Sequence, residues 1–134
     1  MDEDTAAFNE IMQAFSLPKK SDEEKKLRRT AIQSATKVAI EVPFNTMKAA
    51  YESFDLLRAM AEKGNPNSIS DAGVGALCAR ASVRGAFLNI KTNAAGLDDE
   101  NYKSNILMKA EDLLKKAEES ENEILKIAES KIGK

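Results

Sequence analysis

Apolar residues recur at every third or fourth position along most of the chain, which is the spacing of one face of an α-helix. In the first such segment, residues 5–17, the apolar positions are Phe8, Ile11, Met12 and Phe15. No stretch alternates apolar and polar residues as a half-buried strand does. The pattern therefore predicts an all-α fold, a bundle of five or six helices formed by residues 1–134 as one domain.

Capping residues and a proline delimit the first two predicted helices. Asp2 or Asp4 can cap the first helix, and Pro18 ends it because proline disfavours helical geometry in the residue before it. Ser21 and Glu24 have the spacing of a capping box, in which each side chain bonds to the backbone of the other residue. A second helix is therefore expected to begin after Ser21.

The end of the second helix is ambiguous because of a proline. The helical pattern continues to about Glu41, and Pro43 either kinks this helix or separates it from a third over residues 44–63. Gly64 suits a helix end because glycine readily adopts the left-handed conformation, and Pro66 prevents continuation.

Two further helices complete the prediction. One opens near Ser70 and runs to about Asn93, with Gly96 as its stop, and the last starts at Asp98 or Asp99. The apolar positions of the last helix are Ile106, Ala110, Leu113, Leu114, Ala117, Ile124 and Ile127 or Ala128. Its other face is rich in Lys and Glu, as expected of a solvated surface.

Small residues crowd the segment that follows the loop GNPNSISD, and they include Gly73, Gly75 and Gly85. Each glycine inside a helix costs roughly 0.5–1 kcal/mol relative to alanine, so these positions need a reason. One reading is close packing of helices within the bundle or between subunits, and the other is a flat ligand lying against the helix. The polar loop residues either satisfy two helix ends or present amides to an anion or a polar heterocycle.

Composition excludes several classes of function. Twenty basic and 22 acidic residues give a net charge of −2, which predicts no nucleic-acid partner. No apolar run is long enough for a membrane span, and the acidic N-terminus lacks a signal core. Cys78 is the only cysteine, so no internal disulfide can form, and we expect a cytoplasmic protein.

The sequence contains no histidine, which narrows the possible chemistry. Ser-His-Asp and Cys-His catalysis are removed, and with one cysteine a zinc site is not expected. We expect no metal and no prosthetic group. Any acid–base chemistry then falls to Asp, Glu, Lys or Tyr.

Four blocks occur in order along the chain: AFNEIMQAFSLPK (7–19), RRTAIQSATKVAIEVP (28–43), GNPNSISDAGVGAL (64–77) and VRGAFLNIKTN (83–93). Together they resemble the formimidoyltetrahydrofolate cyclodeaminase and methenyltetrahydrofolate cyclohydrolase family, which includes the C-terminal domain of formiminotransferase-cyclodeaminase. The resemblance implies a helical domain that forms a homodimer or a higher oligomer. It also implies a tetrahydrofolate derivative as substrate, held in a crevice between helices, and a formiminotransferase domain as a possible partner.

The resemblance also implies site residues. The aspartate proposed as catalytic in the family lies just before the AF of the first block, and the matching residue here is Asp4. The polar positions that match the family blocks, and that we expect to bind substrate, are Lys19, Arg29, Asn65, Asp71 and Asn89. The family domain usually begins earlier, with a glycine-rich segment that has no match here, so the chain is expected to be shorter than the family at its N-terminus.

The expected reaction is cyclodeamination of 5-formimidoyltetrahydrofolate to 5,10-methenyltetrahydrofolate and ammonia. Ring closure is intramolecular, so the protein mainly has to fold the substrate and move protons. Asp4 is the candidate for this proton shuttle, and its alternative role is to cap the first helix. The basic residues from Lys19 to Arg29 are either a solvated surface or an attraction for a polyglutamylated folate tail.

Two alternatives to cyclodeamination remain. The first is methenyltetrahydrofolate cyclohydrolase, which passes through a similar tetrahedral carbon. The second is an inactive helical fragment that serves oligomerisation.

Overall fold

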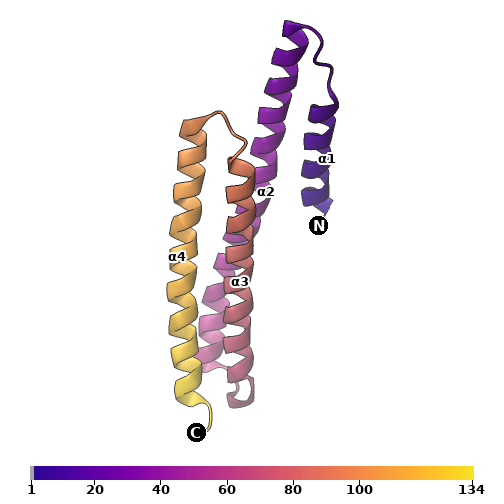
Figure 1. Ribbon diagram of the computed structural model, residues 1–134. Helices are drawn as coiled ribbons and strands as arrows, with labels where there is room; N and C mark the ends of the chain where they lie inside the picture. Colours follow the sequence, from indigo (N-terminus) through magenta and orange to yellow (C-terminus); the bar gives the residue numbers. More distant parts are fainter. Residues whose placement is uncertain (1) are drawn as a thin grey trace.

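The computed structural model describes residues 2–134, and its secondary structure is entirely helical (Figure 1). The elements are α1 (Asp2–Ser16), α2 (Asp22–Lys63), the 3₁₀ turn η1 (Pro66–Ser68), α3 (Ile69–Ala94) and α4 (Glu100–Lys131). The predicted all-α class is confirmed. The predicted number of helices is wrong, because these residues form four α-helices rather than five or six.

The difference in number arises at Pro43, which lies inside α2 and does not end it. Proline has no amide hydrogen, so the carbonyl of Ala39, four residues earlier, loses its helical donor. The side-chain amide of Asn93 on α3 replaces that donor, with Nδ2 3.0 Å from the Ala39 oxygen. A contact between helices therefore keeps α2 continuous over 42 residues.

The predicted capping box is confirmed at the start of α2. The Glu24 amide donates to Ser21 Oγ at 3.1 Å, and the Ser21 amide donates to the Glu24 carboxylate at 3.3 Å. Asp99 caps α4 through a bond from the Tyr102 amide, one of the two starts predicted. At the first helix, α1 already begins at Asp2, which places Asp2 and Asp4 within its first turn.

Gly64 ends α2 in an extended conformation with φ −70°, not in the left-handed conformation expected. Its amide donates to the Met60 carbonyl at 2.9 Å. A Cβ at this position would collide with that same oxygen. Close approach of Gly64 to the preceding turn therefore explains the glycine.

The core of the protein is a three-helix bundle formed by the second half of α2 with α3 and α4 (Figure 1). Side chains from all three helices meet there. Its largest fully buried members are Phe54, Ile40, Met47, Ile90, Ile124 and Val83. Arg80 of α3 adds ion pairs to Glu118 and Glu121 of α4 at 3.6 and 3.8 Å.

Helix α1 and the first third of α2 form a two-helix arm, residues 2–35, whose connecting loop projects beyond α3 and α4 (Figure 1). Only Ala7 and Ala14 of α1 are buried. Most of the predicted apolar face of α1 is exposed, with Phe8, Met12 and Phe15 exposed by 60, 53 and 51%, while Ile11 is half-buried. The small residues, rather than the large ones, make the helix contact.

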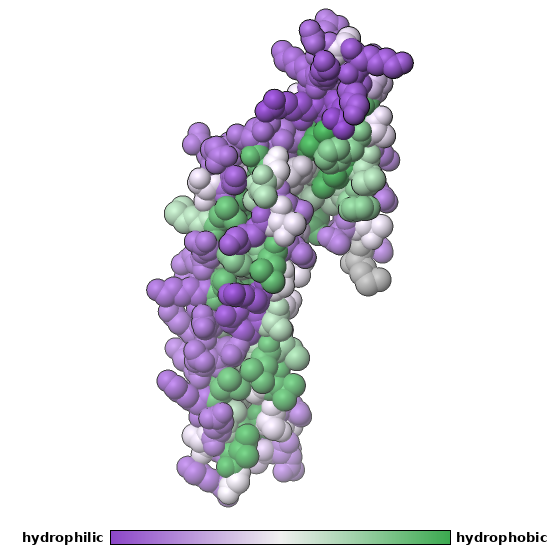
Figure 2. Space-filling view, in the orientation of Figure 1, coloured by the Kyte–Doolittle hydropathy of each residue, from purple (hydrophilic) through white to green (hydrophobic). Residues whose placement is uncertain are grey.

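A second group of exposed apolar side chains follows the bundle. Figure 2 shows apolar surface on the lower part of the visible face, over the region of α3. The exposed apolar side chains of α3 are Val74, Leu77 and Leu88, and those of the adjoining part of α2 are Leu56 and Met60. In the part of the chain that the structure describes, no helix is long and apolar enough to cross a membrane.

The three α3 glycines have different surroundings. A Cβ on Gly73 would touch Leu125 and Ala128 of α4, and a Cβ on Gly75 would lie 2.5 Å from Leu57 Cδ2 of α2. A Cβ on Gly85 would meet nothing within 4 Å. Packing inside the bundle therefore accounts for Gly75 alone, where a Cβ would displace the Leu57 side chain. A Cβ at Gly73 would make only ordinary van der Waals contacts, so neither Gly73 nor Gly85 is explained by packing within the chain.

Candidate functional site

Two clefts meet where the N-terminus of α1 approaches the middle of α2 and the C-terminal half of α3. The first has a volume of about 470 Å³ and is lined by Asp2, Glu3, Asp4, Val42, Pro43, Thr46, Ser82, Ala86 and Asn89. The second, of about 330 Å³, is lined by Asp4, Thr5, Ala7, Phe8, Ile11, Ala39, Asn89, Thr92 and Asn93. Asp4 and Asn89 line both, so we call this region the Asp4–Asn89 cleft.

The helical repeat explains which α3 residues reach the cleft. Ser82, Ala86, Asn89 and Asn93 are spaced by three or four residues and lie on one face of α3. Ser82 and Ala86 are small and leave room between α3 and α2, while the two asparagines supply polar groups. This face of α3 thus leaves room for a ligand and supplies groups that can form hydrogen bonds with it.

The charge of the first cleft is negative. Asp2, Glu3 and Asp4 occupy the first turn of α1, and none of the described residues that line this cleft is basic. Carboxylates in the first turn are favourable for the helix dipole, which accounts for part of the clustering. Among residues 2–134, neither Asp4 nor Asn89 has a side-chain hydrogen bond or an ion pair, so both are available to a ligand.

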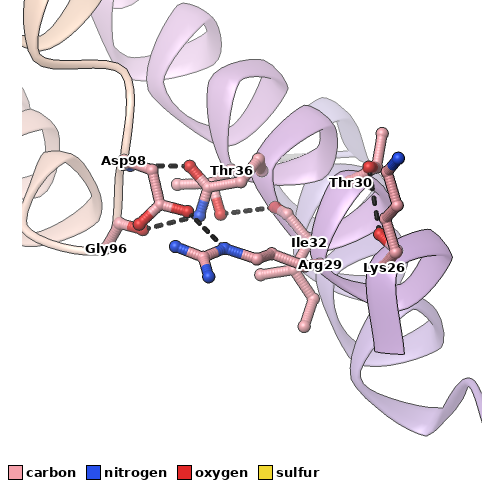
Figure 3. Close-up of polar contacts among 8 residues, drawn as sticks. Lys26, Arg29, Thr30, Ile32, Thr36, Gly96 and Asp98 are labelled. Atoms are coloured by element: carbon pink, nitrogen blue, oxygen red, sulfur yellow. Dashed lines mark hydrogen bonds and ion pairs between the residues drawn. The ribbon is translucent and has the colours of Figure 1, made fainter. Parts of the chain in front are cut away.

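Arg29 lies in a different cleft, of about 430 Å³, between α2 and the loop that joins α3 to α4. Its Nε donates to Asp98 at 2.8 Å, and Figure 3 shows the side chain reaching from α2 to this loop. The hydrogen bond and the charge of each partner raise the pKa of Arg29 and lower that of Asp98. Arg29 is thereby engaged in joining the arm to the bundle.

Two neighbouring residues strengthen this link. Gln33 donates to the Gly96 carbonyl at 2.9 Å and accepts from the Asp98 amide at 2.7 Å. Lys37 pairs with Asp99 at 2.7 Å, and this bond is the largest cause that lowers the pKa of Asp99. We call Arg29, Gln33 and Lys37 with Gly96, Asp98 and Asp99 the polar clasp.

Lys19 lies in the loop between α1 and α2, exposed to solvent. Helix α1 separates it from Asp4, and 15 residues at 1.5 Å per residue make about 22 Å along the axis. Within one chain, Lys19 therefore does not join the Asp4–Asn89 cleft.

Asn65 and Asp71 lie at the opposite end of the bundle. Asn65 Oδ1 accepts from the Asn67 amide at 3.0 Å and so caps η1, and Asp71 is exposed in the first turn of α3. Asp71 precedes Asn89 by 18 residues, or about 27 Å of helix. Of the six site residues predicted, one chain brings only Asp4 and Asn89 together.

The prediction omitted four polar residues of α2 and α3 that line the cleft, besides Asp2, Glu3 and Thr5 of α1. Thr46, Ser82, Thr92 and Asn93 approach Asp4 and Asn89 from α2 and α3. Helical spacing from Asn89 would have pointed to Ser82 and Asn93 on the same face. Nothing in the sequence pattern singles out Thr46, because its position depends on how α1 folds back on α2.

Comparison with known families matches the chain to the family described as formiminotransferase-cyclodeaminase, over residues 1–112. A methenyltetrahydrofolate cyclohydrolase of Methylorubrum extorquens is 43% identical over 131 residues, covering 98% of this chain and 63% of the relative. A formimidoyltransferase-cyclodeaminase of Gallus gallus is 32% identical over 131 residues, covering 98% of this chain and 24% of that protein.

The crystal structure of a formiminotetrahydrofolate cyclodeaminase from Thermotoga maritima superimposes with a TM-score of 0.81. The match covers 96% of this chain and 60% of that one, at 26% identity. The chain thus spans less than two thirds of the length of each of these three relatives.

Proposed function

The chain belongs to the formiminotransferase-cyclodeaminase family, and from this we propose that it acts on the one-carbon unit carried between N5 and N10 of tetrahydrofolate. The family places it among enzymes of folate one-carbon metabolism. The Asp4–Asn89 cleft is the proposed active site. Its first cleft combines a volume of about 470 Å³ with carboxylates and an amide that have no side-chain partner among residues 2–134.

The first candidate reaction is hydrolysis of 5,10-methenyltetrahydrofolate to 10-formyltetrahydrofolate. The observation that carries it is the 43% identity to a methenyltetrahydrofolate cyclohydrolase over 98% of this chain. The methenyl bridge is a cation, and a cleft lined by Asp2, Glu3 and Asp4 attracts a cation.

In this reaction, water adds to the methenyl carbon, and the bond from that carbon to N5 then breaks. Asp4 accepts the proton of the attacking water and returns it to N5 as the bond opens. The remaining hydroxyl proton leaves to solvent, and the carbon stays on N10 as a formyl group. Asn89 positions the substrate beside Asp4.

The second candidate is cyclodeamination of 5-formimidoyltetrahydrofolate, favoured by the cyclodeaminases from G. gallus and T. maritima. Here N10 attacks the carbon of the protonated amidine, whose nitrogen becomes an NH2 group in the tetrahedral adduct, and ammonia leaves once this nitrogen gains one more proton. Asp4 carries the proton from N10 to the departing nitrogen. Both reactions pass through a tetrahedral carbon between N5 and N10, so one carboxylate can serve either.

Following the methenyl absorbance distinguishes the two reactions. Loss of absorbance from 5,10-methenyltetrahydrofolate above the uncatalysed rate supports hydrolysis, and its appearance from 5-formimidoyltetrahydrofolate supports cyclodeamination. Asp4→Asn should reduce either rate by about 10²–10⁴-fold, the usual contribution of a general acid–base. Asp112→Asn, on α4, is the matched control. A full rate in Asp4→Asn would remove the proton shuttle from the proposal.

The third reading, an inactive module that serves oligomerisation, makes a different prediction. A folate that binds the native state raises the melting temperature by mass action. Association of the chain without any thermal response to tetrahydrofolate would support the module and count against the enzyme.

The proposal includes a polyglutamylated tail on the folate. Lys19, Lys20 and Lys26 have no side-chain partner among the described residues, whereas Arg28 donates to the Phe15 carbonyl. Free cations on the arm would raise the local concentration of an anionic tail, with an effect that falls as salt rises. Equal and salt-insensitive affinities for mono- and polyglutamylated folate would contradict this part.

We also propose that the chain forms a homo-oligomer, with a second copy covering the outward face of α1. Phe8, Met12 and Phe15 lie there, each more than half exposed, and a net charge of −2 produces little repulsion between copies. Light scattering on the chain at several concentrations measures this directly, and a monomer at all concentrations would contradict it.

A further inference from the structure

Pro43 leaves one backbone carbonyl without a helical partner next to the Asp4–Asn89 cleft. The carbonyl belongs to Ala39, which is buried and lines the second cleft, and Pro43 lines the first. A buried carbonyl without a donor is costly, so the position demands a hydrogen bond from elsewhere. Asn93 provides it, with Nδ2 3.0 Å from the Ala39 oxygen.

This bond settles which way the Asn93 amide points. An asparagine side chain has a donor end and an acceptor end, and only the nitrogen can donate to a carbonyl. With Nδ2 turned to Ala39, Oδ1 has to occupy the other side of the amide. Among the described residues Oδ1 accepts no hydrogen bond, and Asn93 lines the cleft.

Asn93 is placed where an acceptor with this orientation complements the other residues of the cleft. Asn93 lies four residues after Asn89, one turn further along the same face of α3. It is half-buried, so an acceptor there is partly shielded from water. A neutral acceptor also adds hydrogen-bonding capacity without adding to the charge of Asp2, Glu3 and Asp4.

We infer that Asn93 is a ligand-contacting residue, which accepts a hydrogen bond from a ring or amino N–H of a reduced pterin, and that Pro43 acts as its positioning residue by locking the amide. The inference rests on the proposed function for the identity of the ligand. A heterocycle with N–H donors fits an amide oxygen of fixed direction. An analogue that offers only an acceptor at that position would be rejected.

The alternative is that Asn93 only satisfies Ala39 and never meets a ligand. The variant Pro43→Ala distinguishes these two readings, because it restores an amide hydrogen to α2. Ala39 then has its helical donor, and the Asn93 amide is free to turn. We expect Pro43→Ala to raise the melting temperature and to weaken ligand binding about threefold, through partial loss of the orientation.

The decisive measurement is calorimetric titration of 5-formyltetrahydrofolate into the full chain and its variants. Asn93→Ala should lower the melting temperature and weaken binding by about tenfold, the usual effect of losing one hydrogen bond. In Pro43→Ala/Asn93→Ala the melting temperature should recover, because Ala39 is satisfied again. Binding should remain about tenfold weaker, because the acceptor is still missing.

Recovery of affinity in the double variant would overturn the inference, since the role of Asn93 would then be structural. Asn67→Ala, an exposed asparagine in η1 at the far end of the bundle, is the control and should bind like the unchanged chain. Absence of binding by the unchanged chain would instead refute the proposed function, and the inference with it. The two failures are therefore distinguishable.

Discussion

The two halves of α2 have similar patterns of apolar residues but very different surroundings. In the second half, Phe54 lies between α3 and α4 and is 2% exposed. In the first half, where α1 is the neighbour, Leu27 is 69% exposed. A pair of helices cannot surround a large side chain, whereas three helices can. The number of neighbours, and not the pattern itself, decides whether an apolar residue is buried.

The arm and the bundle also differ in the residues that their helices bury against one another. The bundle buries large side chains of Phe, Ile, Met and Val together with many alanines, whereas the buried residues of α1, Ala7 and Ala14, are both small. Small residues let α1 approach α2 closely while its larger side chains turn outward. The arm therefore contributes little apolar burial of its own, and its position depends on contacts such as the polar clasp.

Replacing one phenylalanine in the bundle and one in the arm should give the largest difference in stability between the two regions. Phe54→Ala should lower the free energy of unfolding by about 3–5 kcal/mol, because it removes a buried ring and leaves a cavity. Phe8→Ala, on the outward face of α1, should cost less than about 1 kcal/mol in the monomer. Urea denaturation followed by circular dichroism, at a concentration where the chain is monomeric, measures both. Equal losses would mean that the comparison of the two regions is wrong.

Self-association, unlike stability, should be weakened more by substitutions in the arm than by substitutions in the bundle. Changing Phe8, Met12 and Phe15 together to Ser removes apolar area that a second copy would cover, and should weaken association by at least about tenfold. Val74→Ser, on the exposed face of α3, is the comparison. Sedimentation at several concentrations measures both. A larger effect from Val74→Ser would move the contact from the arm to the bundle.

Much of the fold could be predicted because its signals are local. The capping box of Ser21 and Glu24 and the cap at Asp99 each depend on residues within one turn, and the structure has them as predicted. The continuity of α2 could not be predicted in this way. It depends on Asn93, which lies 54 positions from Ala39 along the chain.

The candidate site was predictable only in part, for the same reason. Asp4 and Asn89 meet because α1 folds back along α2 while α3 runs beside it, and no local pattern contains that arrangement. Asn65 and Asp71 follow α2 directly in the sequence, yet they lie at the opposite end of the bundle. Because a helix rises by 1.5 Å per residue, the 18 residues between Asp71 and Asn89 correspond to about 27 Å along α3.

The α3 glycines give a finer test of packing inside the bundle. Gly85→Ala should raise the free energy of unfolding by about 0.5–1 kcal/mol, since its Cβ meets no atom within 4 Å and alanine is the better helix former. Gly75→Ala should gain about nothing, because Leu57 would have to change rotamer to make room. Thermal unfolding of the two variants provides the comparison. Destabilisation by Gly85→Ala at high concentration only would show that another copy approaches this glycine.

The smallest expected effect concerns the polar clasp, which joins the arm to the bundle. Arg29 lowers the pKa of Asp98 in the folded chain. Its contribution to stability is then fully present above the unfolded pKa of about 3.9 and is lost as pH falls through the lower folded value. The melting temperature of Asp98→Asn should therefore lie slightly below that of the unchanged chain at pH 7.

The two melting temperatures should begin to converge as pH falls below about 4 and should meet once pH is below the lowered folded pKa of Asp98, where its carboxyl group is protonated in the unchanged chain as well. Because Arg29 and Asp98 are more than half exposed, salt should narrow the difference at neutral pH. Asp112→Asn, which removes a pair with Lys116 inside α4 alone, is the control. If hydrogen exchange in residues 22–37 rises in Asp98→Asn but not in Asp112→Asn, the clasp holds the arm. Equal exchange in both variants would mean that α1 and α2 keep the arm in place without it.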